Sequence, residues 1–327
     1  MIRAFLILAL TFGATTLQAR CKGSNLRNLL TPQYQELLKQ EVAQVPFAYG
    51  NHWIATKGER RIHIVGTQHS GDSRMRAMMR TLRSVIKSAD AVLLEVDSAQ
   101  LATSDQQLQA NPSLVFLAKG KKLSQMMTSQ EWLMLRTSAT FAGLRPEITA
   151  KMQPWLLSIL INRTGCGGRG IASYAGLDDR IERTAIRAGV PVGSLESILD
   201  GFRALSSQAL PDQLRLLQLD LVSTVNFDDQ IVTQTEAYFN GTLTEAKIIQ
   251  KWTLYRDVDI SRPEVARLLR QWEARILDRR NRAWIPVILG SKAKTLVVAV
   301  GALHLPGRAG VLNLLKSRGF TLVRGEL

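Results

Sequence analysis

The chain has 327 residues, of which 46% are hydrophobic and 21% are charged. This composition is typical of a folded globular protein and excludes a largely disordered chain, and the length suits one large domain or two ordinary ones. The formal net charge of +15 suits contact with an anionic membrane or cell-wall surface. Basic residues spread along the whole chain are also expected of a plainly solvated surface, which is the simpler interpretation.

Residues 1–19 have the arrangement of a secretory signal peptide. Arg3 is followed by an apolar stretch and then by the small residue Ala19. The apolar stretch is shorter than the roughly 20 residues that a membrane-spanning helix needs. We therefore expect export to the periplasm, where nucleic acid is not an expected partner. Because Leu17 is bulkier than the small residue favoured three positions before a cleavage site, an uncleaved leader that anchors the protein is the alternative.

Two cysteines, Cys21 and Cys166, follow this leader. An exported protein meets an oxidising compartment, so we expect them to form one disulfide bond. Such a bond would close a long loop and stabilise the fold by roughly 2–5 kcal/mol. Two free, buried thiols are the alternative.

Four short runs rich in Val, Ile and Leu predict buried strands. They lie at residues 60–66, 90–97, 190–196 and 294–301. Between the first two, residues 75–88 carry apolar side chains at steps of three and four, which predicts an amphipathic helix. A strand, a crossover helix and a second strand indicate α/β organisation. The fourth run is followed in the same way by a helical pattern and by the strand-like sequence FTLVRG.

Long helical patterns occupy residues of about 105–165 and 205–285. A capping box from Ser261 to Glu264 predicts a well-defined helix start in the second of these segments. We therefore predict an α/β fold in which a mostly parallel sheet, split in the sequence, carries large helical insertions that form a cap. Residues 20–327 would form a single domain. The apolar faces of the insertions suit a cap over a site or a homodimer interface, and composition does not decide between these.

The phrases GTQH and GALH each place a histidine three residues after a glycine, just past a predicted strand. They contain Gly66 with His69 and Gly301 with His304, and Glu95 ends the strand between them. Ligands bind outside the carboxyl ends of parallel strands, where glycine lets the backbone turn and approach a ligand. Two imidazoles and one carboxylate form a set that can hold a divalent metal with open positions. Such a metal favours hydrolysis.

Other polar residues have weaker sequence support. His63 lies inside a predicted strand and is expected to be packed, whereas His52 is expected in a turn or at the surface. Glu196 ends a predicted strand as Glu95 does, and Asp178 is placed to cap the helix that starts near it. We do not include these four residues in the predicted site.

The paired GxxH motifs resemble those of the TraB/PrgY/GumN family, which includes the TIKI metalloproteases and is related to the erythromycin esterase and ChaN-like proteins. Further matching sequences are LLEVD with Glu95, GLDDRIERTAIRAGVPVGSLES, ILDRRNRAW and the C-terminal VVAVGALHLPGRAGVLNLLKSRGFTLVR. The resemblance runs from about Pro46 to the C-terminus. Two GxxH motifs in this order, with the intervening sequences, are specific where a single motif would not be.

This resemblance implies a metal-assisted hydrolase, with peptide cleavage known for the TIKI members and manganese or cobalt as the ions. It points to His69, Glu95 and His304 as the site. It adds Arg280 and Asn281 as residues that orient the substrate or stabilise an oxyanion, although a solvated helix face is an equal interpretation of these two.

The sequence therefore predicts an exported hydrolase that cleaves peptide or amide bonds with a divalent metal, namely manganese, cobalt or zinc. One alternative is a metal-free hydrolase of the erythromycin esterase type, in which a histidine acts as general base and Glu95 orients it. The other is a periplasmic binding protein that captures a peptide or small molecule without chemistry.

Overall fold

The computed structural model describes residues 23–69, 71–161, 176–222, 227–257 and 260–327. The predicted signal peptide and the predicted disulfide partners Cys21 and Cys166 lie outside the described residues. Within the described ranges, none of the helices combines the length and the apolar character that crossing a bilayer would require.

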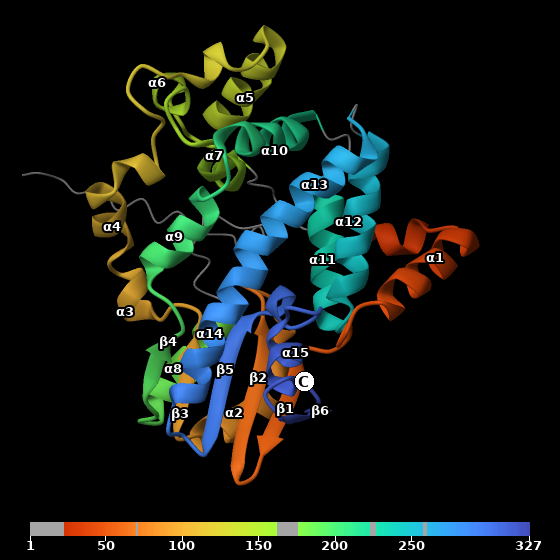
Figure 1. Cartoon of the computed structure of the whole chain (residues 1–327), viewed down its shortest axis with the longest axis vertical. Helices are drawn as coiled ribbons and strands as arrows, with labels where there is room; N and C mark the ends of the chain where they lie inside the picture. The colour runs from red at the N-terminus through yellow and green to blue at the C-terminus, as the bar shows by residue number, and fades with distance from the viewer. Residues whose placement is uncertain (1–22, 70, 162–175, 223–226, 258–259) are drawn as a thin grey trace, which may run out of the picture.

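A six-stranded mixed sheet forms the centre of the fold (Figure 1). Its spatial order is β4-β3-β5-β2-β1-β6. The first four strands in this order are parallel to one another, and β1 runs antiparallel to both β2 and β6. The strands are β1 (His52–Lys57), β2 (Arg60–Thr67), β3 (Ala91–Leu94), β4 (Val192–Ser194), β5 (Thr295–Gly301) and β6 (Thr321–Arg324).

Helices cover both faces of the sheet. On one face, α2 (Met75–Lys87) and α8 (Leu177–Arg187) pack against Val65 and the side chains of β3 and β5 that point the same way. On the other, α14 (Arg279–Gly290) and α15 (Val311–Lys316) pack against the alternate side chains. Because β2 and β5 are covered on both faces, residues 62–67 of β2 and 296–300 of β5 are all buried.

The remaining helices form two groups beyond the sheet, seen in the upper half of Figure 1. In the first group, α5, α7 and α10 share an apolar core. This group and the segments leading to it comprise α3 (Ser98–Leu101), α4 (Ser104–Ala110), α5 (Ser129–Phe141), α6 (Pro146–Thr149), α7 (Pro154–Ile161), α9 (Ile198–Ser206) and α10 (Leu210–Val222). The second group comprises α1 (Pro32–Ala43), α11 (Phe227–Phe239), α12 (Leu243–Asp257) and α13 (Arg262–Glu273).

One long helical run connects the second group to the sheet. It starts at Ser261, whose side chain accepts a hydrogen bond from the backbone of Glu264, and continues through α13. A π-helical turn at Ala274–Asp278 then leads into α14. A π-turn widens the helix and shifts the direction of the side chains that follow, and such turns are frequent at functional sites. Here it immediately precedes the first turn of α14, which carries Arg280 and Asn281.

These observations confirm the predicted fold class, an α/β sheet carrying helical insertions, and a strand in each of the four predicted runs, although β4, at the edge of the sheet, is only partly buried. The expectation for His52 is wrong: this residue begins β1 and is only 5% exposed. The prediction omitted β1 altogether, although Gly58, at a φ of 57°, closes a tight hairpin in which Lys57 pairs with Arg60. The ring of His52 stacks on that of His63 across the two strands.

Candidate active site

Three neighbouring parallel strands end together at one edge of the sheet. β5 lies between β2 and β3, and Thr67 at the end of β2 pairs with Gly301 at the end of β5. His69 follows β2 by two residues, Glu95 directly follows β3, and His304 lies three residues after β5. The topology therefore brings all three predicted residues to the edge at which ligands bind in open parallel sheets.

Both carboxylate oxygens of Glu95 are engaged. Oε1 accepts a hydrogen bond of 2.6 Å from the backbone N–H of Gly301, and Oε2 accepts one of 2.6 Å from Nη2 of Arg280. Although burial alone would raise the pKa of Glu95, the neighbouring His304 and Arg280 lower it to about 2. Glu95 is thus a carboxylate anion at neutral pH.

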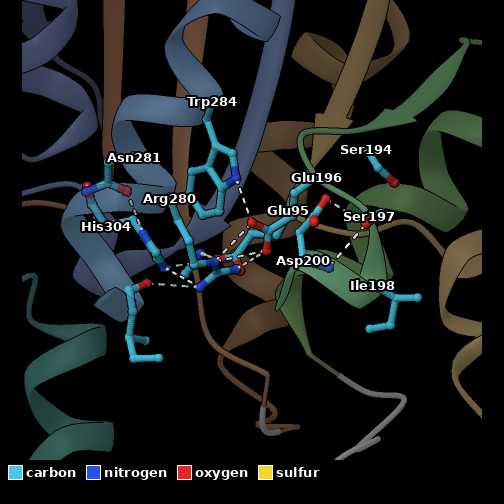
Figure 2. A network of polar contacts seen from close by, with 12 residues as sticks. Glu95, Ser194, Glu196, Ser197, Ile198, Asp200, Arg280, Asn281, Trp284 and His304 are labelled. Atoms are coloured by element: carbon cyan, nitrogen blue, oxygen red, sulfur yellow. Dashed lines mark hydrogen bonds and ion pairs between the residues drawn. The ribbon is translucent and has the colours of Figure 1, made fainter. Parts of the chain in front are cut away.

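Arg280 is the centre of the polar network (Figure 2). Its side chain is only 15% exposed. It donates from Nε and Nη2 to Glu196 over 2.6–3.1 Å and from Nη2 to Glu95. Its Nη1 donates to the carbonyl of Ile276 at 3.2 Å, and the guanidinium lies 4.8 Å from the ring centroid of Trp284. Two carboxylates, a carbonyl and an aromatic ring therefore hold this cation in one orientation.

Glu196 is the second anion of the network. It lies two residues after the end of β4. Its carboxylate accepts hydrogen bonds from Arg280 and, at 3.1 Å, from the indole N–H of Trp284. Burial raises the pKa of Glu196, and Arg280 opposes this shift. Because Trp284 is fully buried, its N–H gives Glu196 a rigid donor that solvent does not compete for.

His304 is buried and held in one tautomer. Its Nδ1 lies 2.6 Å from Oδ1 of Asn281, whose amide group donates to the carbonyls of His304 and Ala309. Since Oδ1 only accepts, Nδ1 carries the proton and Nε2 keeps its lone pair. Nε2 lies 3.2 Å from Nη1 of Arg280 and 3.6 Å from Oε1 of Glu95. Burial lowers the pKa of His304 to about 4, so the ring is neutral.

His69 stands apart from this network and is paired with Asp178. Its Nδ1 lies 2.9 Å from Oδ2 of Asp178, and the side chain is 64% exposed. This hydrogen bond raises the pKa of His69 to about 9, so the ring is protonated at neutral pH; Glu95 adds to this shift and Arg280 opposes it. A Cβ on Gly176, the residue that precedes α8, would lie 2.8 Å from the Cα of His69, so glycine permits the close approach.

The glycines of the two GxxH motifs provide space. A Cβ on Gly66 would lie 2.9 Å from the Cβ of Ala302, and one on Gly301 would lie 3.1 Å from Oε1 of Glu95. Neither glycine has the left-handed conformation, so both positions require close packing instead of an unusual φ angle. The hydroxyl of the buried Tyr238 donates to the carbonyl of Gly66 at 3.0 Å and fixes the end of β2.

The donor types at this edge suit a divalent metal. Both His69 and His304 direct Nδ1 to an oxygen acceptor, as metal-bound histidines usually do, so Nε2 is the nitrogen that would coordinate; in His69 it would first have to lose a proton. Glu95 supplies an ionised carboxylate. The arrangement is not that of a preassembled centre, because Arg280 contacts both Glu95 and His304. In the described part of the chain, no three His, Cys, Asp or Glu side chains are grouped closely enough to hold an ion.

Comparison with known proteins identifies the family. The family model for TraB/PrgY/gumN matches residues 51–324. The chain belongs to the TraB/PrgY/gumN family. Two curated relatives, both named "Uncharacterized protein YbaP", come from Escherichia coli K12 and Shigella flexneri. Each is 25% identical to this chain over 273 residues, covering 82% of the chain and 94% of the relative. Family membership agrees with the resemblance seen in the sequence and supplies no activity.

Three residues at this family's GxxH edge were absent from the predicted site. Asp178 was expected to cap a helix, but Gly176 occupies the N-cap position and Asp178 faces His69. Glu196 lies just past the end of β4, as Glu95 lies just past the end of β3, and this position at a strand end could have marked Glu196 as a site residue. Trp284 lies one helical turn after Arg280, but its role depends on which face of α14 meets the sheet, and the sequence does not show this.

Proposed function

We propose that this protein is a metal-dependent hydrolase of peptide or amide bonds. The observation that carries the proposal is the orientation of the two histidines. Each gives its Nδ1 proton to an oxygen acceptor, so that Nε2 is the nitrogen that would coordinate an ion, in His69 after loss of the second proton that its raised pKa retains. The anionic Glu95 lies at the same edge of the sheet, so the donors are two imidazoles and one carboxylate.

His69, Glu95 and His304 would hold the ion, with manganese, cobalt or zinc as the candidates. When bound, a divalent ion of this kind lowers the pKa of a coordinated water and polarises a carbonyl oxygen. The protein's own part is to fix the ligands. Asn281 and Asp178 determine the tautomer and ring orientation of the histidines, and such outer contacts matter nearly as much as the ligands themselves.

Arg280 supplies a second positive charge at this edge. Glu196 and Trp284 hold its guanidinium, so the cation is oriented before substrate arrives. A fixed donor of this kind stabilises the negative charge that develops on a carbonyl oxygen during attack. Nη1 of Arg280 now contacts Nε2 of His304, and it has to withdraw from that nitrogen when His304 coordinates an ion.

The position of Arg280 also favours a second candidate, a metal-free hydrolase. In this case Arg280 keeps its contacts with Glu95 and His304 and supplies the positive charge by itself. His69, oriented by Asp178, exchanges protons with water and the leaving group. This pairing differs from the earlier metal-free alternative, because Asp178 and not Glu95 orients the histidine.

Elemental analysis tests the proposal. The protein is purified without chelator and compared with His304→Ala, Glu95→Gln and the matched control Glu59→Gln, whose carboxylate is exposed on the far side of the fold. We expect about one equivalent of metal in the protein and in Glu59→Gln, and little in the two site variants.

Hydrolysis of a peptide library before and after chelation completes the test. Activity that is lost on chelation and restored by added ion supports the metal-dependent proposal. Full metal content in a folded His304→Ala protein contradicts it. Turnover that survives chelation indicates the metal-free enzyme, and saturable peptide binding without turnover for any added ion indicates a binding protein.

A further inference from the structure

We propose that the exposed face of α2 binds a membrane surface rich in anionic lipid headgroups. Four cations follow one another along this helix, at Arg76, Arg80, Arg83 and Lys87, and all four are exposed. Their spacing of four, three and four residues places them on one side of the helix. We call these four residues the α2 basic stripe.

The buried side of α2, roughly 110° around the helix from the stripe, fixes the direction of the stripe. Five side chains on that side are buried against the sheet, and they are Met75, Met78, Met79, Leu82 and Ile86. Because this apolar face is locked into the main core, the helix has no freedom to rotate its cations toward a protein partner within the chain. The stripe is therefore a permanent feature of the surface.

The charges of the stripe are not neutralised by the protein. α2 contains no acidic residue. Among the described residues, no carboxylate lies within ion-pair distance of the four stripe side chains. Nearby arginines differ in this respect: Arg74 pairs with Asp72 and Glu236, and Arg183 of α8 pairs with Asp179. The stripe is thus a local concentration of positive charge that no carboxylate of the described residues neutralises.

This arrangement works against the stability of the helix. Like charges three or four residues apart repel each other on a helix surface. Arg76 also lies in the first turn, where the helix dipole disfavours a cation. Neither effect is offset by contacts within the described residues, so an external anion is the partner that relieves both.

The shape and chemistry of the stripe favour a membrane surface over nucleic acid. It is a straight row about 16 Å long, given 1.5 Å of rise per residue, on the outside of a convex helix. The exposed side chains beside the stripe are small, as at Ala77, Thr81 and Ser84. No aromatic side chain of α2 is available to stack on bases. Charge alone, without groups that insert or read bases, suits the phosphate layer of an anionic bilayer.

Vesicle co-sedimentation tests this assignment. The probe is vesicles of phosphatidylglycerol mixed with phosphatidylcholine, with pure phosphatidylcholine as the neutral reference. The variant replaces all four stripe residues by Gln. The matched control removes the same number of exposed lysines elsewhere, at Lys119, Lys121, Lys122 and Lys292, and all proteins carry the same N-terminus.

We expect the unmodified protein to bind the anionic vesicles, to release them as salt is raised and to ignore the neutral ones. The stripe variant should bind at least about tenfold more weakly, while the control variant binds like the unmodified protein. Thermal unfolding of the stripe variant should be unchanged or shifted upward, because repulsion within α2 has been removed.

Equal loss of binding in both variants would mean that net charge alone acts, and it would overturn the proposal. So would a stripe variant that binds as before. Duplex DNA provides the last comparison: tighter binding to DNA than to vesicles, abolished in the stripe variant, would assign the stripe to nucleic acid instead. None of these outcomes depends on the hydrolase proposal, since no step measures turnover or metal.

Discussion

Replacing Arg280 by Met tests how the site is held together. The substitution keeps most of the side-chain length and a good helix former, but it leaves Glu95 and Glu196 without their shared counter-charge. Removing one partner of a buried ion pair costs about 3–5 kcal/mol. Because burial already raises the pKa of Glu196, this carboxylate can take up a proton, which removes part of the electrostatic cost. We therefore expect the free energy of unfolding to fall by an amount near the lower limit, about 3 kcal/mol.

Urea unfolding at pH 7, followed by circular dichroism, measures this loss. In thermal unfolding the same change corresponds to about 6–12 °C, at about 2–4 °C for each kcal/mol in a chain of this size. Arg282→Met is the matched control on the same helix. Arg282 is 59% exposed and lies 4.0 Å from Asp278, so its loss should cost at most about 1 kcal/mol.

Two results would refute the reasoning. One is a loss of less than about 1 kcal/mol for Arg280→Met, which would mean that solvent or another cation readily replaces the guanidinium. The other is an equal loss in Arg282→Met, which would mean that the helix and not the site is affected. If the metal proposal is correct, added manganese should recover more stability in Arg280→Met than in the unmodified protein, because the ion takes over the missing positive charge.

Two further predictions concern the sheet. Burial, with smaller effects from neighbouring charges, lowers the pKa of His63 to about 4, so between pH 6.5 and 4 the unfolded chain binds a proton that the folded protein excludes. The contribution of His63 to stability should fall by up to about 3 kcal/mol as pH drops through this window, and His52 and His304, whose pKa values are also lowered, act in the same direction. Urea midpoints across the window that do not change in this direction would contradict the assignment. In Gly66→Ala the new Cβ would clash with the turn after β5, and we expect a loss of stability of about 1–3 kcal/mol. The control Gly290→Ala meets open space and should be neutral or slightly stabilising. Equal unfolding midpoints for the two variants would show that the turn after β5 shifts to accommodate the Cβ without cost.

The sequence by itself was sufficient to predict the strands β2, β3, β4 and β5 and the helix α2. Their patterns are local: a continuous apolar run marks a strand covered on both faces, and steps of three and four mark a helix covered on one. Because parallel strands end at a common edge, the residues after three such strands could be placed near each other without coordinates. His69, Glu95 and His304 were found in this way.

Tertiary structure alone decided which residues contact these three. Asp178 reaches His69 because α8 begins beside the end of β2, and Trp284 reaches Glu196 because one face of α14 packs on the sheet. These pairs are separated by about a hundred residues, and nothing in their local sequence records the distance between them. The same holds for Arg280, whose guanidinium lies against Glu95 only because the helix containing it crosses the sheet at that edge. Local sequence determines which elements form, whereas the packing of distant elements determines the chemistry at their junction.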